Sequence, residues 1–174
     1  MSSRYFAPHA ANSTVKDKKL QIVCQSGLAA HECPLFNALR TLIGADSVSN
    51  RAVITTEAAP AAIGPYSQGI KVGNTVWISG QIPLDPTSMK IVSGDITAEA
   101  EQVFRNLSAV AEASGGTLND AVKINISLTD LGGFEAVNAV MAGYFEEPYP
   151  ARACVQVAAL PKGVRIEVEA ILAL

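Results

Sequence analysis

Two side chains near the C-terminus have the chemistry to bind and transform a small acid. Arg152 begins an apolar segment just after a proline, where its guanidinium can form charge-assisted bidentate bonds to a carboxylate. Glu167 lies between two aliphatic residues, and such surroundings disfavour ionisation, so its carboxyl could exchange a proton near neutral pH. Both also have plainer interpretations: an arginine paired with a surface glutamate, and a solvated strand face that Glu167 shares with Glu169.

Three weaker signals accompany them. Cys154 is two residues from Arg152 and therefore on the same strand face, where a cation would favour the thiolate; the alternative is a small buried hydrophobic residue. Tyr66 lies in a loop between Gly64-Pro65 and Gly69, which would hold its phenol rigidly. Ser79-Gly80 ends a strand, and the glycine lets backbone amides approach a ligand. Turn formation alone also explains both loops.

The residue types that are missing exclude much of the remaining chemistry. Residues 52–174 contain no histidine and a single cysteine. Ser-His-Asp and Cys-His mechanisms need an imidazole, and zinc sites usually need His or Cys ligands, so neither can be built there. No glycine-rich nucleotide fingerprint occurs either. We therefore expect an enzyme without cofactor or metal, and a lone thiol fits a reducing compartment.

Regular patterning predicts the first elements that position these residues. Segments 70–72 and 75–79 flank Gly73-Asn74, which favours a tight hairpin. A helix follows, with Asp95 or Thr97 as its N-cap and Gly115-Gly116 as its end. Its apolar positions recur at helical spacing and predict one buried face, made of Val103, Leu107, Val110 and Ala111.

The second half of the body predicts one more helix and three strands. Residues 122–129 alternate, with Val122, Ile124, Ile126 and Leu128 on one face of a half-buried strand. Gly132-Gly133 then precedes a second helix that Pro148 and Pro150 close, with an apolar side formed by Phe134, Val137, Val140, Met141, Tyr144 and Phe145. Segments 152–158 and 164–172 read as two strands with a hairpin-like connection.

The resulting order, β-β-α-β-α-β-β, predicts an α+β fold with both helices on one face of a mixed sheet. The other face keeps Ala, Val and Ile positions together with Glu167 and Glu169. A face that is too apolar for water but carries a few charges is a candidate subunit interface.

Composition divides the chain near residue 51. Residues 1–51 carry six basic and three acidic residues and no sustained period, which predicts an N-terminal extension that is disordered or a targeting segment. Residues 52–174 carry seven basic and thirteen acidic residues, a net charge of −6 that argues against nucleic acid. No apolar run reaches the ~18 residues of a membrane span, so no membrane partner is expected. The expected compartment is the cytoplasm, or a mitochondrion or other organelle if residues 1–50 form a transit peptide.

Four motifs together resemble one family. Residues 52–174 are similar to the reactive intermediate deaminase family, RidA/YjgF, through IGPYSQG (63–69), ISGQIPLDP (78–86), NLSAVAEASG (106–115) and PARACVQVAALPKGVRIEVEA (150–170). The resemblance implies a chorismate-mutase-like subunit, a homotrimer with ligand sites between subunits, and hydrolysis of enamine or imine intermediates such as 2-aminoacrylate to 2-oxo acids and ammonia.

The resemblance also implies roles for individual residues. Arg152 would clamp the substrate carboxylate, and Glu167 would position or activate the attacking water. The pocket would be lined by Tyr66, Ser79, Gly80, Asn138 and Cys154. Ala153 departs from the serine that many members carry, which leaves the preference among imino acids open.

Other functions remain as alternatives at this stage. The same cleft could bind small carboxylates without turnover, or the trimer could act as a holdase through apolar surface. Ribonuclease or translation-inhibitor activity ranks lower, because RNA cleavage without histidine needs unusual groups and the body is acidic.

Overall fold

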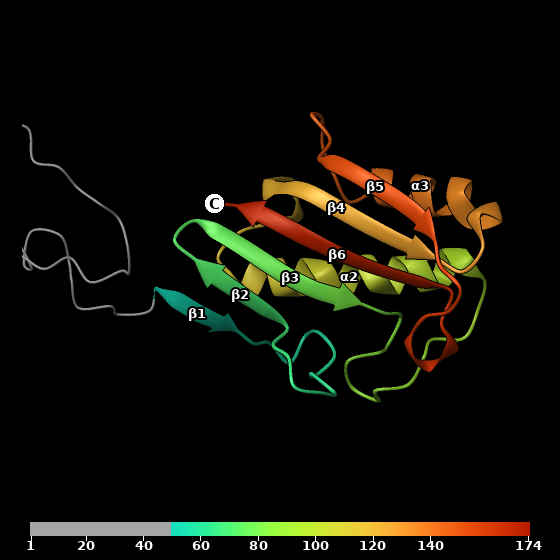
Figure 1. Ribbon diagram of the computed structural model, residues 1–174, viewed down its shortest axis with the longest axis horizontal. Coiled ribbons are helices and arrows are strands. Elements are labelled where there is room, and N and C mark those ends of the chain that lie inside the picture. Colours follow the sequence, from blue (N-terminus) through green and yellow to red (C-terminus); the bar gives the residue numbers. More distant parts are fainter. Residues whose placement is uncertain (1–49) are drawn as a thin grey trace, which may run out of the picture. The chain divides into compact units, whose positions relative to one another are not determined.

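A six-stranded mixed sheet with two α-helices on one face makes up residues 50–174, which the computed structural model describes (Figure 1). Of the expected N-terminal extension only Asn50 and Arg51 fall within this part, and Arg51 begins the first strand. The sheet order is β1-β2-β3-β6-β4-β5. The strands are β1 (Arg51–Ile54), β2 (Gly69–Val72), β3 (Thr75–Gln81), β4 (Ala121–Leu128), β5 (Ala151–Gln156) and β6 (Ile166–Ala173).

The predicted hairpin and first helix are confirmed. β2 and β3 pair antiparallel around Gly73, whose φ of 58° is the left-handed conformation that glycine adopts easily. Helix α2 (Ile96–Ala113) is capped by Asp95, whose carboxylate accepts a hydrogen bond from the Ala98 amide at 3.0 Å. Beyond its end Gly115 has a φ of 90°, as expected for a helix stop.

The core lies between the sheet and the helices. The apolar face of α2 packs onto the central strands, and α3 (Phe134–Ala142) packs beside α2 near β4 and β5 (Figure 1). The largest fully buried side chains are Phe104, Leu107, Ile124, Ile126, Leu128, Ile166 and Leu172. No helix within residues 50–174 has the length and hydropathy that a membrane crossing requires.

The predicted hairpin-like connection between the last two strands is wrong. β5 pairs with β4 in parallel, and β6 pairs antiparallel with both β3 and β4, so β4 lies between β5 and β6. The connection crosses the end of β4, where the Thr129 amide donates to the Arg165 carbonyl at 3.0 Å. A short loop between two strands suggests a hairpin. Here β6 instead pairs with β3 on one side and β4 on the other, so neither of its edges is left for β5.

One strand is absent from the sequence-based order, and two further predictions need correction. The sequence does not predict β1, because its four residues show no clean alternation. Val122 is exposed rather than buried, since a register shift between Ala121 and Lys123 turns it away from the core. Helix α3 ends at Ala142, well before the prolines, and Tyr144 and Phe145 pack against Phe104 from the segment that follows it.

Candidate active site

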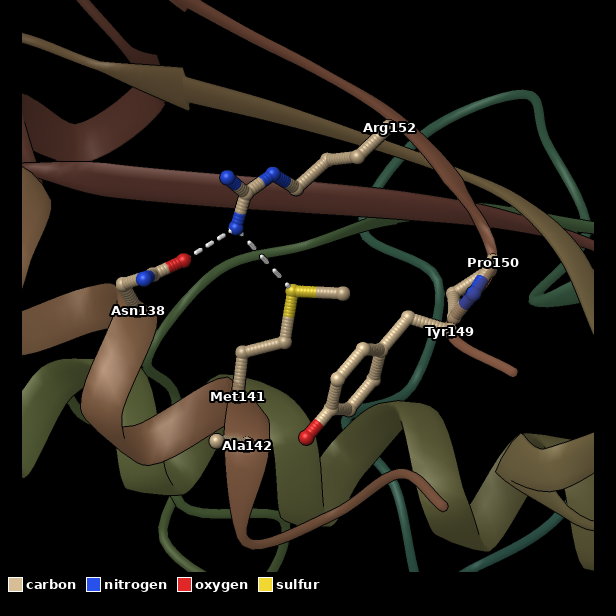
Figure 2. A pocket seen from close by; sticks show the side chains of 6 residues that line it. All are labelled: Asn138, Met141, Ala142, Tyr149, Pro150 and Arg152. Carbon is tan, nitrogen blue, oxygen red and sulfur yellow. Dashed lines mark hydrogen bonds between the residues drawn. The ribbon is translucent and has the colours of Figure 1, made fainter. Parts of the chain in front are cut away.

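Arg152 lies in a pocket between the start of β5 and α3. Its Nη1 donates to Asn138 Oδ1 and to Met141 Sδ, the latter at 3.6 Å, as Figure 2 shows. Its guanidinium carbon also lies 5.2 Å from the centre of the Phe134 ring. The pocket has a volume of about 360 Å³ and is completed by Ala142, Tyr149 and Pro150.

The partners of Arg152 are all neutral. Among residues 50–174 the two ion pairs join Arg105 to Glu101 and Arg165 to Glu99, so no described carboxylate pairs with Arg152. Both side-chain bonds use Nη1, which leaves the edge formed by Nε and Nη2 without a described partner. That edge carries two parallel N–H groups, the arrangement that binds a carboxylate side-on. Within residues 50–174, Arg152 is therefore not paired with a surface glutamate, which was its plainer interpretation.

Glu167 lies in a second pocket, on β6. The cavity has a volume of about 360 Å³ and is lined by Ile63, Gly64, Tyr66, Ser79, Gly80, Ile82, Pro161 and Glu167. Burial raises the pKa of the Glu167 carboxyl above its usual range, and the neighbouring Glu169 raises it further. The expectation that this carboxyl holds its proton more tightly than an exposed one is thus supported. Three of the five residues that the resemblance placed in the pocket, Tyr66, Ser79 and Gly80, lie here.

A bulge in β3 makes room for the Glu167 carboxylate. The pairing of β3 with β6 shifts between Ile78 and Gln81, so that Ser79 and Gly80 leave the regular ladder. A Cβ on Gly80 would collide with Glu167 Oε1, so any larger residue must displace the carboxylate. The sequence suggested that this glycine lets backbone amides reach a ligand, whereas in the described chain it lets Glu167 approach the backbone.

Two buried amides that the sequence analysis missed hold the loops around this pocket. The Gln68 side chain accepts from the Thr56 amide at 2.7 Å and donates to the carbonyls of Thr56, Ala59 and Pro60. It thereby anchors the start of the loop that carries Tyr66, whose hydroxyl accepts from the Ile63 amide at 3.3 Å.

On the other side, fully buried Asn106 of α2 donates to the carbonyls of Ile82 and Leu84, at 3.2 and 3.0 Å. It fixes the chain that leaves β3. Both amides stand in motifs that the sequence analysis quoted, but an amide gives no sequence signal of the backbone groups that it will meet.

Arg152 and Glu167 lie on opposite faces of the sheet. Arg152 is opposite Ile124, whose side chain is buried under the helices, so Arg152 points to the helical face. Glu167 is flanked along β6 by the buried Ile166 and Val168 and therefore points to the open face. Neither pocket contains residues of the other. A single chain thus presents two half-sites, one cationic and one acidic.

Cys154 lies near Arg152 but lines neither of these two pockets. It points to the helical face, as its spacing from Arg152 predicts, and packs against the hydrophobic core. Burial raises the pKa of its thiol, and the positive charge of Arg152 only partly opposes this shift. The charge of Arg152 thus favours the thiolate as expected, but desolvation outweighs it, and the alternative of a small hydrophobic residue packed against the core describes Cys154 better. No cluster of three or more His, Cys, Asp or Glu residues suited to a metal occurs within residues 50–174.

Comparisons with known proteins agree with the motifs. A family model described as Endoribonuclease L-PSP matches residues 56–174. A protein of Dermatophagoides farinae named 2-iminobutanoate/2-iminopropanoate deaminase is 47% identical over 125 residues, which cover 72% of this chain and 98% of that protein.

Two solved structures are also similar. RidA from an Antarctic Psychrobacter species is 57% identical, with a TM-score of 0.69 over 71% of this chain and 99% of that chain. Escherichia coli TdcF with bound serine is 41% identical, with a TM-score of 0.68 over 71% of this chain and 98% of that chain. With the family model covering more than half of its length, the chain belongs to the Endoribonuclease L-PSP family, the RidA/YjgF family that its motifs resemble.

Proposed function

We propose that this protein hydrolyses 2-imino acids, and the enamines such as 2-aminoacrylate that tautomerise to them, to 2-oxo acids and ammonia. The observation that carries the proposal is the free edge of Arg152, a cation without a described acidic partner that lines a pocket. Relatives named as deaminases of 2-iminobutanoate and 2-iminopropanoate, which are small carboxylates, support it. So does the serine bound to the relative TdcF, since serine carries a carboxylate.

The reaction needs orientation and proton transfer rather than a strong catalyst. Arg152 binds the carboxylate through Nε and Nη2, which fixes the imine carbon. Water adds to that carbon, and the nitrogen takes up protons and leaves as ammonia while the C=N bond becomes C=O. The raised pKa of Glu167 suits proton transfer: its acid form can donate a proton to the nitrogen, and its conjugate base can accept one from the attacking water.

We further propose that the complete site forms between two copies of the chain, in a homotrimer of the chorismate-mutase-like type. Arg152 and Glu167 point to opposite faces of one sheet and cannot hold one small molecule together within a single chain. The open face also exposes apolar side chains that a second copy would cover, including Val53, Trp77 and Val155. In a cyclic assembly each interface joins the Arg152 side of one copy to the Glu167 side of the next.

A complementation experiment tests both proposals. Arg152→Ala and Glu167→Gln should each lose most of the ammonia release from an imine generated by an amino-acid oxidase. If the two residues come from different copies, an equimolar mixture that is unfolded and refolded together contains sites with both residues intact. Random cyclic assembly gives about a quarter of the wild-type activity.

Each alternative has its own result in this experiment. No recovery by refolded mixtures that contain mixed oligomers would place both residues in one chain and end the shared-site proposal. Full activity of Arg152→Ala would remove the assigned clamp. Binding of 2-oxobutanoate without ammonia release would instead identify a carboxylate-binding protein.

RNA cleavage is the second candidate, because the description of the family model names an endoribonuclease. The net charge of −6 and the lack of histidine in residues 52–174 argue against it. Degradation of RNA by purified protein, lost in Arg152→Ala or Glu167→Gln, would reverse this ranking.

A further inference from the structure

Helix α3 presents one row of side chains to Arg152. Phe134, Asn138 and Met141 are spaced i, i+4 and i+7, which places them on one side of the helix. They contact the guanidinium through a ring face, an amide oxygen and a thioether sulfur. Figure 2 shows Asn138 and Met141 of this row converging on the same nitrogen of Arg152.

The row meets two requirements of an anion clamp at once. Arginine on an exposed edge strand has a long, freely rotating side chain, and ordering it on ligand binding costs about 2 kcal/mol of rotamer entropy. Contacts at Nη1 and on the ring face fix the guanidinium before a ligand arrives. Because all three partners are neutral, the positive charge of Arg152 remains available to a carboxylate ligand. A glutamate in the row would instead neutralise that charge.

We propose that Phe134 and Met141 are positioning residues, which together with Asn138 hold Arg152 with its Nε–Nη2 edge turned toward the substrate carboxylate. This inference rests on the proposed function, since it assigns the ligand of that edge. It does not depend on turnover, because the same orientation governs binding of an unreactive carboxylate.

The test compares binding with catalysis in conservative variants. Phe134→Leu keeps apolar volume but removes the ring face, and we expect KM for the imine and Kd for 2-oxobutanoate to rise about three- to thirty-fold, with kcat within about twofold. Met141→Leu keeps the side-chain volume and loses a weak acceptor. We therefore expect KM and Kd to rise in the same way, but by a smaller factor. Phe134→Tyr restores a ring face and should recover most of the affinity.

Matched controls separate positioning from folding. Leu131→Ala truncates a side chain of similar exposure just before α3 that lies outside the row of residues in contact with Arg152, and it should leave both constants unchanged. Circular dichroism melting of each variant reports on the fold.

The outcomes distinguish this inference from the proposed function. Unchanged affinity in Phe134→Leu, with binding lost in Arg152→Ala, would overturn the positioning role and leave the clamp in place. A fall in kcat alone would also overturn it. Loss of 2-oxobutanoate binding in Phe134→Leu with recovery in Phe134→Tyr would support it even if no imine were hydrolysed.

Discussion

Glu167 illustrates how a single candidate catalytic residue is expected to act against stability. Its carboxyl is partly buried against Gly80, and Glu169 is on the same face of β6. Both conditions disfavour the charged form, and no described basic side chain forms an ion pair with it. A group kept in such surroundings is typical of a proton-transfer site.

Replacing this carboxyl should therefore stabilise the fold in a pH-dependent way. Because the pKa of Glu167 is raised on folding, the folded chain binds more protons than the unfolded chain between the usual glutamate pKa and the raised value. Stability is then lost as pH rises through that interval. We expect Glu167→Gln to melt above the wild type at pH 7 and to lose this advantage at about pH 3.5, below the usual pKa of glutamate.

Melting curves at both pH values measure this difference, and Glu146→Gln in an exposed loop serves as the control. An equal advantage of Glu167→Gln at the two pH values would mean that ionisation of this carboxyl carries no cost. Since the same substitution should abolish ammonia release, stability and activity are expected to change in opposite directions.

At the scale of elements, the pocket of Glu167 depends on loops that are held by side chains outside the pocket. The segment before β2 is anchored by Gln68 and the segment after β3 by Asn106. Just before β6, buried Glu99 accepts hydrogen bonds from Arg165, which ties the start of α2 to the start of the strand that carries Glu167. The regular elements provide the frame, and these polar side chains place the irregular segments on it.

Removing the Gln68 anchor should loosen both the fold and the site. Gln68→Ala leaves one amide and three carbonyls of the 56–60 segment without their side-chain partner. We expect the free energy of unfolding in urea to fall by about 2–4 kcal/mol. The imine KM should also rise, because Tyr66 is no longer held over the pocket.

Gln156→Ala is the matched control, since it removes one hydrogen bond from an exposed side chain and should cost under about 1 kcal/mol. Suppose instead that Gln68→Ala lowers the free energy of unfolding no more than this control does. Water would then have replaced the hydrogen bonds of the Gln68 side chain at no cost in stability, and Gln68 would not be an anchor of this segment.

At the scale of the whole molecule, the open sheet face is the feature that a single chain leaves unexplained. Val53, Trp77 and Val155 are 63%, 45% and 50% exposed on three different strands of this face. Side chains of this size on one sheet face are compatible with the contact between copies that we propose. The sole tryptophan of the chain is among them, so it can report on assembly directly.

Trp77→Lys should separate the copies without unfolding them, because a lysine in a covered apolar face has to be desolvated. We expect native mass spectrometry to give the mass of one chain for this variant and of three for the wild type, with ammonia release lost and the circular dichroism spectrum kept. Leu131→Lys, an exposed apolar position outside the open face, is the control. A wild-type protein that measures as a monomer would contradict the shared site.

The local structure of this protein could be predicted from its sequence, because it follows from nearest neighbours. Helical spacing from Val103 to Ala111 predicted the buried face of α2, and Asp95 its cap. Gly73-Asn74 predicted the β2–β3 turn. Residue type and strand position made Arg152 and Glu167 candidates beside plainer interpretations, and the resemblance of the motifs assigned them the roles of carboxylate clamp and water activator.

Only the tertiary structure decided which faces and which pockets these residues occupy. Alternation along β6 places Glu167 opposite its aliphatic neighbours, but the pairing of β6 with both β3 and β4 puts the bulge at Gly80 beside it. Alternation along β5 likewise leaves open whether Arg152 meets helix or solvent, and the parallel pairing with β4 turns it to α3. Strand partners are chosen by contacts between segments distant in sequence, and a period of two is the same on either face of a sheet.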